Sequence, residues 1–166
     1  TERFDHVRLD SLRVSEEEIE AAFAAADAAL LATMRQAAEN IRRFHALQLR
    51  QEQRLELEDG IILGQRFTPL ERVGLYVPGG TAAYPSSVLM SAIPAALAGC
   101  PEILMVSPPR PDGSIHPDIL TAAKIAGVTA IFKLGGAQAV AALAYGTESV
   151  PKADKIVGPG NIFVAT

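Results

Sequence analysis

The sequence predicts a three-layer αβα protein: an incomplete Rossmann-like parallel sheet, preceded by a helical arm and a β-hairpin. Four apolar, strand-like runs follow one another, and the first three are each followed by a segment with helical periodicity. The runs are apolar on both faces, as strands are when helices cover both sides of a parallel sheet. Parallel strands need long crossover connections, which these helical segments supply.

The first 54 residues form the predicted arm, because they contain neither glycine nor proline. Ser15 and Glu18 have the spacing of a capping box and predict a helix start. A second helix is predicted from about Ala28 to Leu49. Two helices bury little surface by themselves, so we expect the arm to pack on the rest of the chain or on a partner subunit.

The next segment predicts a two-stranded ribbon. Leu55 to Glu58 alternates apolar and acidic residues, Asp59-Gly60 is a favoured hairpin turn, and an apolar run returns from Ile61. We therefore divide the chain into a helical arm over residues 1–54 and a Rossmann-like domain over residues 55–166.

The βα units of the second part follow in order. The predicted strands are Val73–Val77, Ile103–Val106, Ala130–Leu134 and Lys155–Val157, and the predicted helices are Ser87–Ala98, Pro117–Ala126 and Ala137–Ala144. The sequence stops at Thr166, just after a strand has turned toward what looks like a further helix. We therefore expect the 166 residues to be a piece of a longer polypeptide.

Composition narrows the class of protein. Hydrophobic residues make up 49% and charged residues 20% of the chain, and the net charge of −4 gives no basic footprint for nucleic acid. The single Cys100 excludes an internal disulfide framework and fits a reducing compartment. No apolar run is long enough for a membrane span. The sequence predicts a soluble, cytoplasmic protein.

Three glycine turns follow the predicted strands: Gly79-Gly80, Gly135-Gly136, and Gly158 with Gly160. Such turns allow a ligand phosphate to approach the backbone and the start of the next helix. The alternative is that these glycines only permit the turns. Neither standard glycine-rich nucleotide fingerprint occurs.

Three side chains at these turns are candidate ligand contacts. Tyr76 could stack on a ring or bond a ribose, or could be a core tyrosine with its hydroxyl satisfied. Gln138 could reach a ligand phosphate or make a local capping contact, and Asn161 could contact a ligand or cap a helix. Lys133 and Lys155 could pair with Asp154 or with a ligand, and of these we expect solvated ion pairs. No cluster has metal-ligand spacing, and no nucleophile elbow occurs.

Four blocks of the chain closely resemble the histidinol dehydrogenase family, and the resemblance extends over essentially the whole sequence. These blocks are residues 73–80, 85–90, 135–146 and 150–161. The resemblance implies a homodimeric, zinc-dependent enzyme that oxidises L-histidinol through the aldehyde to L-histidine, the last step of histidine synthesis, with two molecules of NAD.

Carried over by motif, the resemblance implies NAD contacts from Tyr76, Gln138 and Asn161. It places the zinc ligands and a catalytic Glu-His pair beyond Thr166, so this segment alone is expected to be inactive. Three alternatives stay open: a related dehydrogenase acting on another alcohol such as a sulfonated diol, a non-catalytic nucleotide-binding module, and a structural dimerisation domain.

Overall fold

The computed structural model describes residues 7–79 and 83–159. Its larger sheet has four parallel strands in the order β5-β4-β3-β6. These are β3 (Arg72–Tyr76), β4 (Glu102–Ser107), β5 (Ala130–Lys133) and β6 (Lys155–Val157). The predicted parallel sheet and its α/β class are confirmed.

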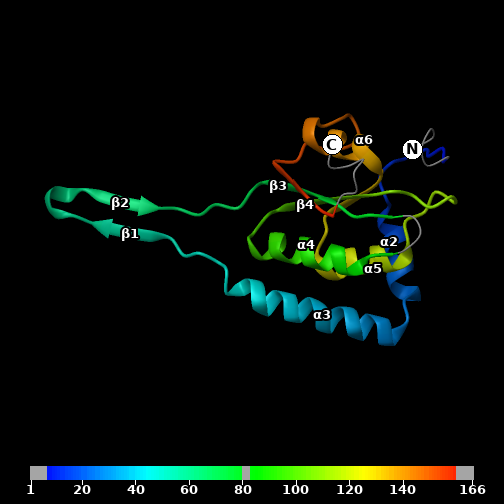
Figure 1. Cartoon of the computed structure of the whole chain (residues 1–166), viewed down its shortest axis with the longest axis horizontal. Helices are drawn as coiled ribbons and strands as arrows, with labels where there is room; N and C mark the ends of the chain where they lie inside the picture. The colour runs from blue at the N-terminus through cyan, green and yellow to red at the C-terminus, as the bar shows by residue number, and fades with distance from the viewer. Residues whose placement is uncertain (1–6, 80–82, 160–166) are drawn as a thin grey trace.

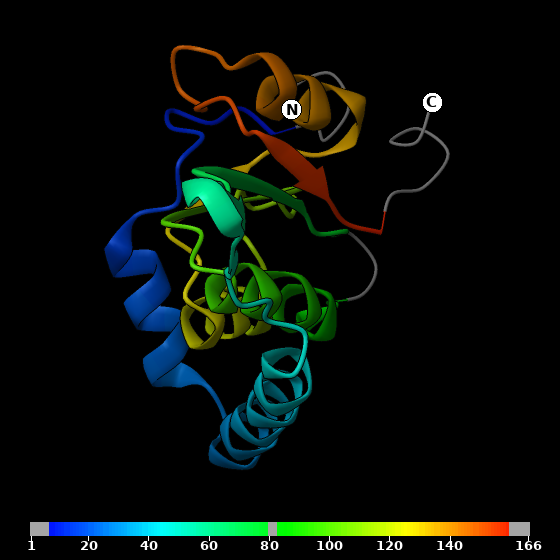
Figure 2. The ribbon, with the colours of Figure 1, turned by 90° about the vertical axis from the view of Figure 1, so that its left-hand side faces the viewer.

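Helices cover both faces of this sheet (Figures 1 and 2). On one face lie α4 (Pro85–Leu97) and α5 (Pro117–Ala126), and on the other lies α6 (Gly136–Tyr145). Alternate strand residues point to opposite faces, so Leu75 belongs to the first apolar cluster and Tyr76 to the second. The two clusters form the core of the three layers.

The arm consists of α2 (Glu16–Ala25) and α3 (Ala28–Ala46). Ser15 and Glu18 form the predicted capping box, and the Asp27 carboxylate accepts hydrogen bonds from the first N–H groups of α3. The arm packs on the rest of the chain: α2 lies against α5, and α3 lies beneath α4 and α5 (Figure 1). Met34 of α3 is buried in the same cluster as Leu75.

The hairpin projects from the body of the molecule (Figure 1). It pairs β1 (Gln53–Glu56) with β2 (Ile62–Gln65) in antiparallel register, and every residue of both strands is exposed. Its turn follows the predicted chemistry, because Asp59 and Gly60 both have positive φ angles, of 68° and 77°.

The N-terminal segment closes one edge of the sheet. Val14 donates a backbone hydrogen bond to Ile131, and Lys133 donates one to Leu12, so residues 12–14 run alongside β5. This contact satisfies backbone groups that would otherwise be free at an edge strand. None of the helices in the described parts of the chain combines the length and the apolar character that crossing a membrane requires.

Candidate functional site

The carboxyl ends of the four parallel strands lie at one edge of the sheet, which we call the carboxyl edge. The strands end there at Tyr76, Ser107, Lys133 and Val157. In open α/β sheets, ligands bind in crevices outside this edge. The described glycines of the predicted turns, Gly79, Gly135, Gly136 and Gly158, follow β3, β5 and β6, so the fold brings them to the same edge.

Two of the three predicted contact residues meet at Gly136. The Tyr76 hydroxyl accepts a hydrogen bond from the Gly136 N–H at 3.2 Å. Gln138 is exposed in the first turn of α6, and its amide folds back over the same glycine: a Cβ added to Gly136 would lie 3.0 Å from its Oε1 atom. Asn161 lies outside the described residues.

Tyr76 itself is a buried side chain, with only 5% of its surface exposed. Its ring packs with Leu104, Val106 and Leu143 under α6. The hydroxyl therefore fixes the turn that follows β5, across the intervening strand β4. One alternative considered from the sequence, a core tyrosine with a satisfied hydroxyl, describes this arrangement.

Pro108 accounts for two of the glycines at the carboxyl edge. A Cβ on Gly79 would lie 2.9 Å from the Pro108 carbonyl oxygen, and a Cβ on Gly135 would lie 2.5 Å from its Cγ atom. Both positions therefore need glycine so that the proline can pack between the two turns. At Gly136, by contrast, the positive φ of 69° favours glycine.

The turn after β6 crosses the tip of β3. Gly158 has a φ of 149°, and a Cβ at this position would collide with the carbonyl oxygen of Tyr76. The backbone that follows β6 thus passes directly against the residue whose hydroxyl holds the β5 turn. This close approach connects the turns of β5 and β6 through Tyr76.

The first turn of α6 keeps backbone donors at this edge. No described side chain caps the helix at Gly135, its N-cap residue. The first N–H groups of a helix have no partner within it, and they carry a partial positive charge. Since Tyr76 takes only the Gly136 N–H, the following N–H groups point toward whatever lies outside the carboxyl edge.

Lys133, the last residue of β5, differs from its sequence-based prediction. Its side chain is only 11% exposed, and its Nζ atom lies 2.7 Å from Oε1 of Glu18 in α2. The expected solvated ion pair was therefore wrong for this lysine, because α2 packs over the end of the strand. A lysine inside the apolar run Ala130–Leu134 is the sequence signal that pointed to a buried partner.

Glu18 is held in its charged form by this arrangement. Burial works to raise the pKa of its carboxyl group, but the hydrogen bonds from Lys133 and from the Ser15 backbone outweigh burial. The pKa of Glu18 therefore lies below its ordinary value of 4.5.

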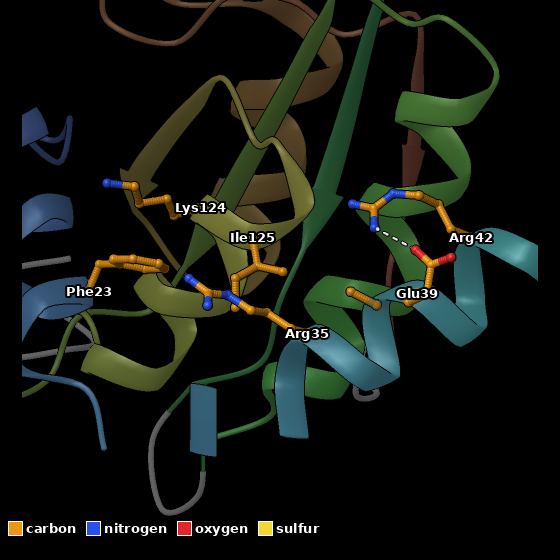
Figure 3. A pocket seen from close by; sticks show the side chains of 7 residues that line it. Phe23, Arg35, Glu39, Arg42, Lys124 and Ile125 are labelled. Carbon is orange, nitrogen blue, oxygen red and sulfur yellow. Dashed lines mark ion pairs between the residues drawn. The ribbon is translucent and has the colours of Figure 1, made fainter. Parts of the chain in front are cut away.

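A cavity of about 450 Å³ lies away from the carboxyl edge, between α2, α3 and α5 (Figure 3). Phe23 lies at its side, with the Lys124 Nζ atom 4.6 Å and the Arg35 guanidinium 5.9 Å from the ring centroid. Lys124 also pairs with Glu20, and Arg42 pairs with Glu39 on α3. The side chains that line this cavity thus contact one another within and between the helices. The packing of the arm on α5 is sufficient to explain the cavity.

Residues 7–79 and 83–159 contain no group of three or more His, Cys, Asp or Glu side chains that could hold a metal ion. The described part of the carboxyl edge thus offers backbone amides, one exposed carboxamide and one buried phenol. These groups can bind and orient a polar ligand, but they do not make a metal centre.

Fold and edge together define the class: a parallel α/β protein with Rossmann-like layers and glycine turns at its carboxyl edge. A family model described as histidinol dehydrogenase matches residues 1–166. The chain belongs to the histidinol dehydrogenase family, as the sequence blocks predicted.

Individual relatives agree with this assignment. The chain is 61% identical over 165 residues to a histidinol dehydrogenase of Geobacillus kaustophilus, covering 99% of this chain and 39% of that protein. It is 54% identical to one from Methanosarcina mazei, again covering 39% of the relative. The crystal structure of histidinol dehydrogenase from Elizabethkingia anophelis superimposes with a TM-score of 0.93 at 44% identity, covering 98% of this chain and 38% of that one. The chain thus spans about 39% of the length of these relatives.

Proposed function

We propose that this chain is the NAD-binding portion of an enzyme that oxidises L-histidinol, through histidinal, to L-histidine. Family membership supports the reaction, and one structural observation supports the role of this segment. That observation is the convergence of Tyr76 and Gln138 on Gly136, at the start of an uncapped helix.

Each group at the edge has a distinct part in this proposal. The N–H groups that follow Gly136 in the first turn of α6, for which the described residues supply no capping side chain, bind the dinucleotide's phosphate or ribose oxygens. The exposed Gln138 carboxamide supplies a further donor and acceptor beside them. Tyr76 holds the turn in place through its hydrogen bond to Gly136. By motif, Tyr76 and Asn161 are also proposed to contact NAD. NAD, when bound, accepts a hydride from the substrate carbon.

Zinc has no place among the described residues, because they lack a suitable cluster of ligands. By resemblance, the zinc ligands and the Glu-His pair that moves protons lie beyond Thr166 in the full-length protein. We accordingly propose that residues 1–166 alone are inactive. We also propose that the full-length enzyme acts in the cytoplasm.

A homodimer is part of the same proposal. The hairpin exposes apolar side chains that a small monomeric domain does not leave in water, among them Leu55, Ile62 and Leu63, each more than half exposed. Phe44 and Leu47, at the end of α3, are exposed as well. In the proposed homodimer, a second copy of the chain covers these apolar side chains. It packs against the arm of residues 1–54 and the start of the domain of residues 55–166.

Turnover by the full-length protein tests the proposed reaction. With zinc present, L-histidinol should reduce two equivalents of NAD per histidine formed, and dihydroxypropanesulfonate should reduce none. NAD reduction by the sulfonated diol alone would assign the chain to a related dehydrogenase. Binding of NAD without turnover of either alcohol would favour a nucleotide-binding module. A protein that forms a dimer but does not bind NAD would favour a structural dimerisation domain.

A further inference from the structure

The ion pair between Lys133 and Glu18 lies immediately before the turn on which the proposed cofactor contacts converge. Lys133 ends β5, and Gly136 begins α6 only three positions later. The pair joins α2, in the arm, to the carboxyl edge across 115 residues of sequence. Among the ion pairs of the described residues, this one has the least exposed basic side chain, because the Lys133 side chain is only 11% exposed.

Glu18 uses both oxygens of its carboxylate. Oε2 accepts a hydrogen bond from the Ser15 N–H at 3.0 Å, and Oε1 accepts one from the Lys133 Nζ atom at 2.7 Å. The Lys133 N–H in turn donates to the Leu12 carbonyl oxygen at 2.7 Å. Residues 12–18 therefore hold the last residue of β5 by both its backbone and its side chain.

The turn beyond Lys133 has little freedom to absorb a displacement. Leu134 is buried, and Gly135 packs against the Pro108 ring with no room for a side chain. The Gly136 N–H is bound to the Tyr76 hydroxyl. A shift at the end of β5 must therefore be passed on to Gly136, and with it to Gln138 two residues further along the same helical turn.

Charge makes this attachment specific. An ammonium group so little exposed to water is costly unless it is paired and hydrogen-bonded. Lys133 thus occupies one position only while the Glu18 carboxylate is present. Without its partner, the lysine side chain gains most by moving toward solvent, and β5 and the turn move with it.

We propose that Lys133 and Glu18 are positioning residues for the NAD site, which hold the Gly135–Gly136 turn and Gln138 in their binding geometry without touching the cofactor. The inference rests on the proposed NAD binding at this edge. It makes the arm a determinant of cofactor affinity, because Glu18 belongs to α2.

The test compares two double variants of the full-length enzyme. Glu18→Gln with Lys133→Met removes the ion pair without leaving a buried charge, and glutamine retains the capping box with Ser15. Its matched control is Glu102→Gln with Arg72→Met. This control removes the Arg72–Glu102 pair, which has an Nε–Oε2 distance of 2.6 Å. The pair joins the first residues of β3 and β4, at the amino ends of the strands, which we call the amino edge.

The carboxyl-edge variant should bind NAD about fivefold more weakly in calorimetric titration and raise the KM for NAD by a similar factor. Its kcat at saturating NAD should stay within about twofold of the wild type, because no reacting group is changed. The amino-edge control should leave the NAD affinity unchanged, whatever its loss in Tm. Equal NAD affinities of the two double variants would overturn the proposal.

A milder variant covers the case in which the double variant does not fold. Glu18→Asp keeps the negative charge but shortens its reach to Lys133 by one methylene group, and it should weaken NAD binding in the same direction. Wild-type affinity in a folded Glu18→Asp protein would count against a positioning role. A wild-type protein that does not bind NAD would instead refute the proposed function itself, so the two failures are distinguishable.

Discussion

Pro108 shows how a single residue can impose glycine at two separate turns. Its ring packs between the turn after β3 and the turn after β5, so that Gly79 and Gly135 both face it at distances too short for a Cβ atom. Glycines beside a proposed nucleotide site are readily taken as phosphate contacts. At these two positions the packing of Pro108 is sufficient to explain why the residue is glycine.

Replacing Gly135 by alanine should therefore destabilise the protein even in the absence of ligand. The added methyl group would lie 2.5 Å from Pro108 Cγ, an overpacking that costs about 2 kcal/mol of unfolding free energy in chemical denaturation. Pro108→Gly in the same chain, which removes both Cγ and the Cβ atom at 2.7 Å, should recover part of this loss. Gly64→Ala, whose nearest neighbour is at 3.6 Å, is the control and should change stability little. Equal stability of Gly135→Ala and wild type would contradict the packing account.

Local sequence patterns were enough to place some residues of the candidate site in the fold but not others. Tyr76 and Gln138 could be placed at strand ends because apolar runs and glycine turns mark those ends locally. The partner of Lys133 could not be found in this way, since Glu18 lies 115 residues earlier and only the packing of α2 on the sheet unites them. The bond between the Tyr76 hydroxyl and Gly136 likewise depends on strand order, which local patterns do not encode.

At the scale of elements, the contact of α2 with β5 depends on pH through Glu18. The pKa of this carboxyl group is lower in the folded chain than its ordinary value of 4.5. A group with a depressed folded pKa stabilises the fold above its unfolded pKa, and that contribution is lost as the pH falls through the folded pKa.

Acid denaturation of Glu18→Gln should show this loss directly. The wild type should be more stable than the variant at about pH 7, and the difference in unfolding free energy should shrink between about pH 5 and pH 3. Urea unfolding at a series of pH values measures it. A difference that stays constant over this range would show that the Glu18 charge does not stabilise the contact.

The strands and the turn of the hairpin could be predicted from the sequence, but the position of the hairpin in the molecule could not. Alternating residues and Asp59-Gly60 predicted its strands and its turn, and both are present. Its projection into solvent was not predictable, because the same alternation also fits a ribbon packed on its own domain. Leu55 faces Leu63 across the ladder, so one face of the projecting ribbon carries apolar side chains.

Charges on that face should break the proposed homodimer. Leu55→Asp with Leu63→Asp in the full-length protein should shift sedimentation from dimer to monomer, because an unpaired carboxylate is costly in an apolar interface. Arg54→Gln, on the opposite face of the same strand, should remain dimeric. A dimer that survives both aspartates would place the interface elsewhere.

For the molecule as a whole, alternation of strands and helices was enough to predict the layers. Buried parallel strands require crossover helices, and these helices must cover both faces. The order β5-β4-β3-β6 was not predictable from periodicity, although it decides which turns are neighbours at the carboxyl edge. It places one strand, β4, between Tyr76 and the turn that its hydroxyl reaches.

The proposed function depends on NAD binding at the carboxyl edge of this sheet. Calorimetric titration of NAD into the full-length protein and its Gln138→Ala variant measures this binding, with zinc content determined on both samples. We expect NAD to bind the variant about tenfold more weakly, because an exposed carboxamide contact is lost, while the zinc content stays the same. Unchanged NAD affinity in the folded variant, with wild-type zinc content, would contradict the account.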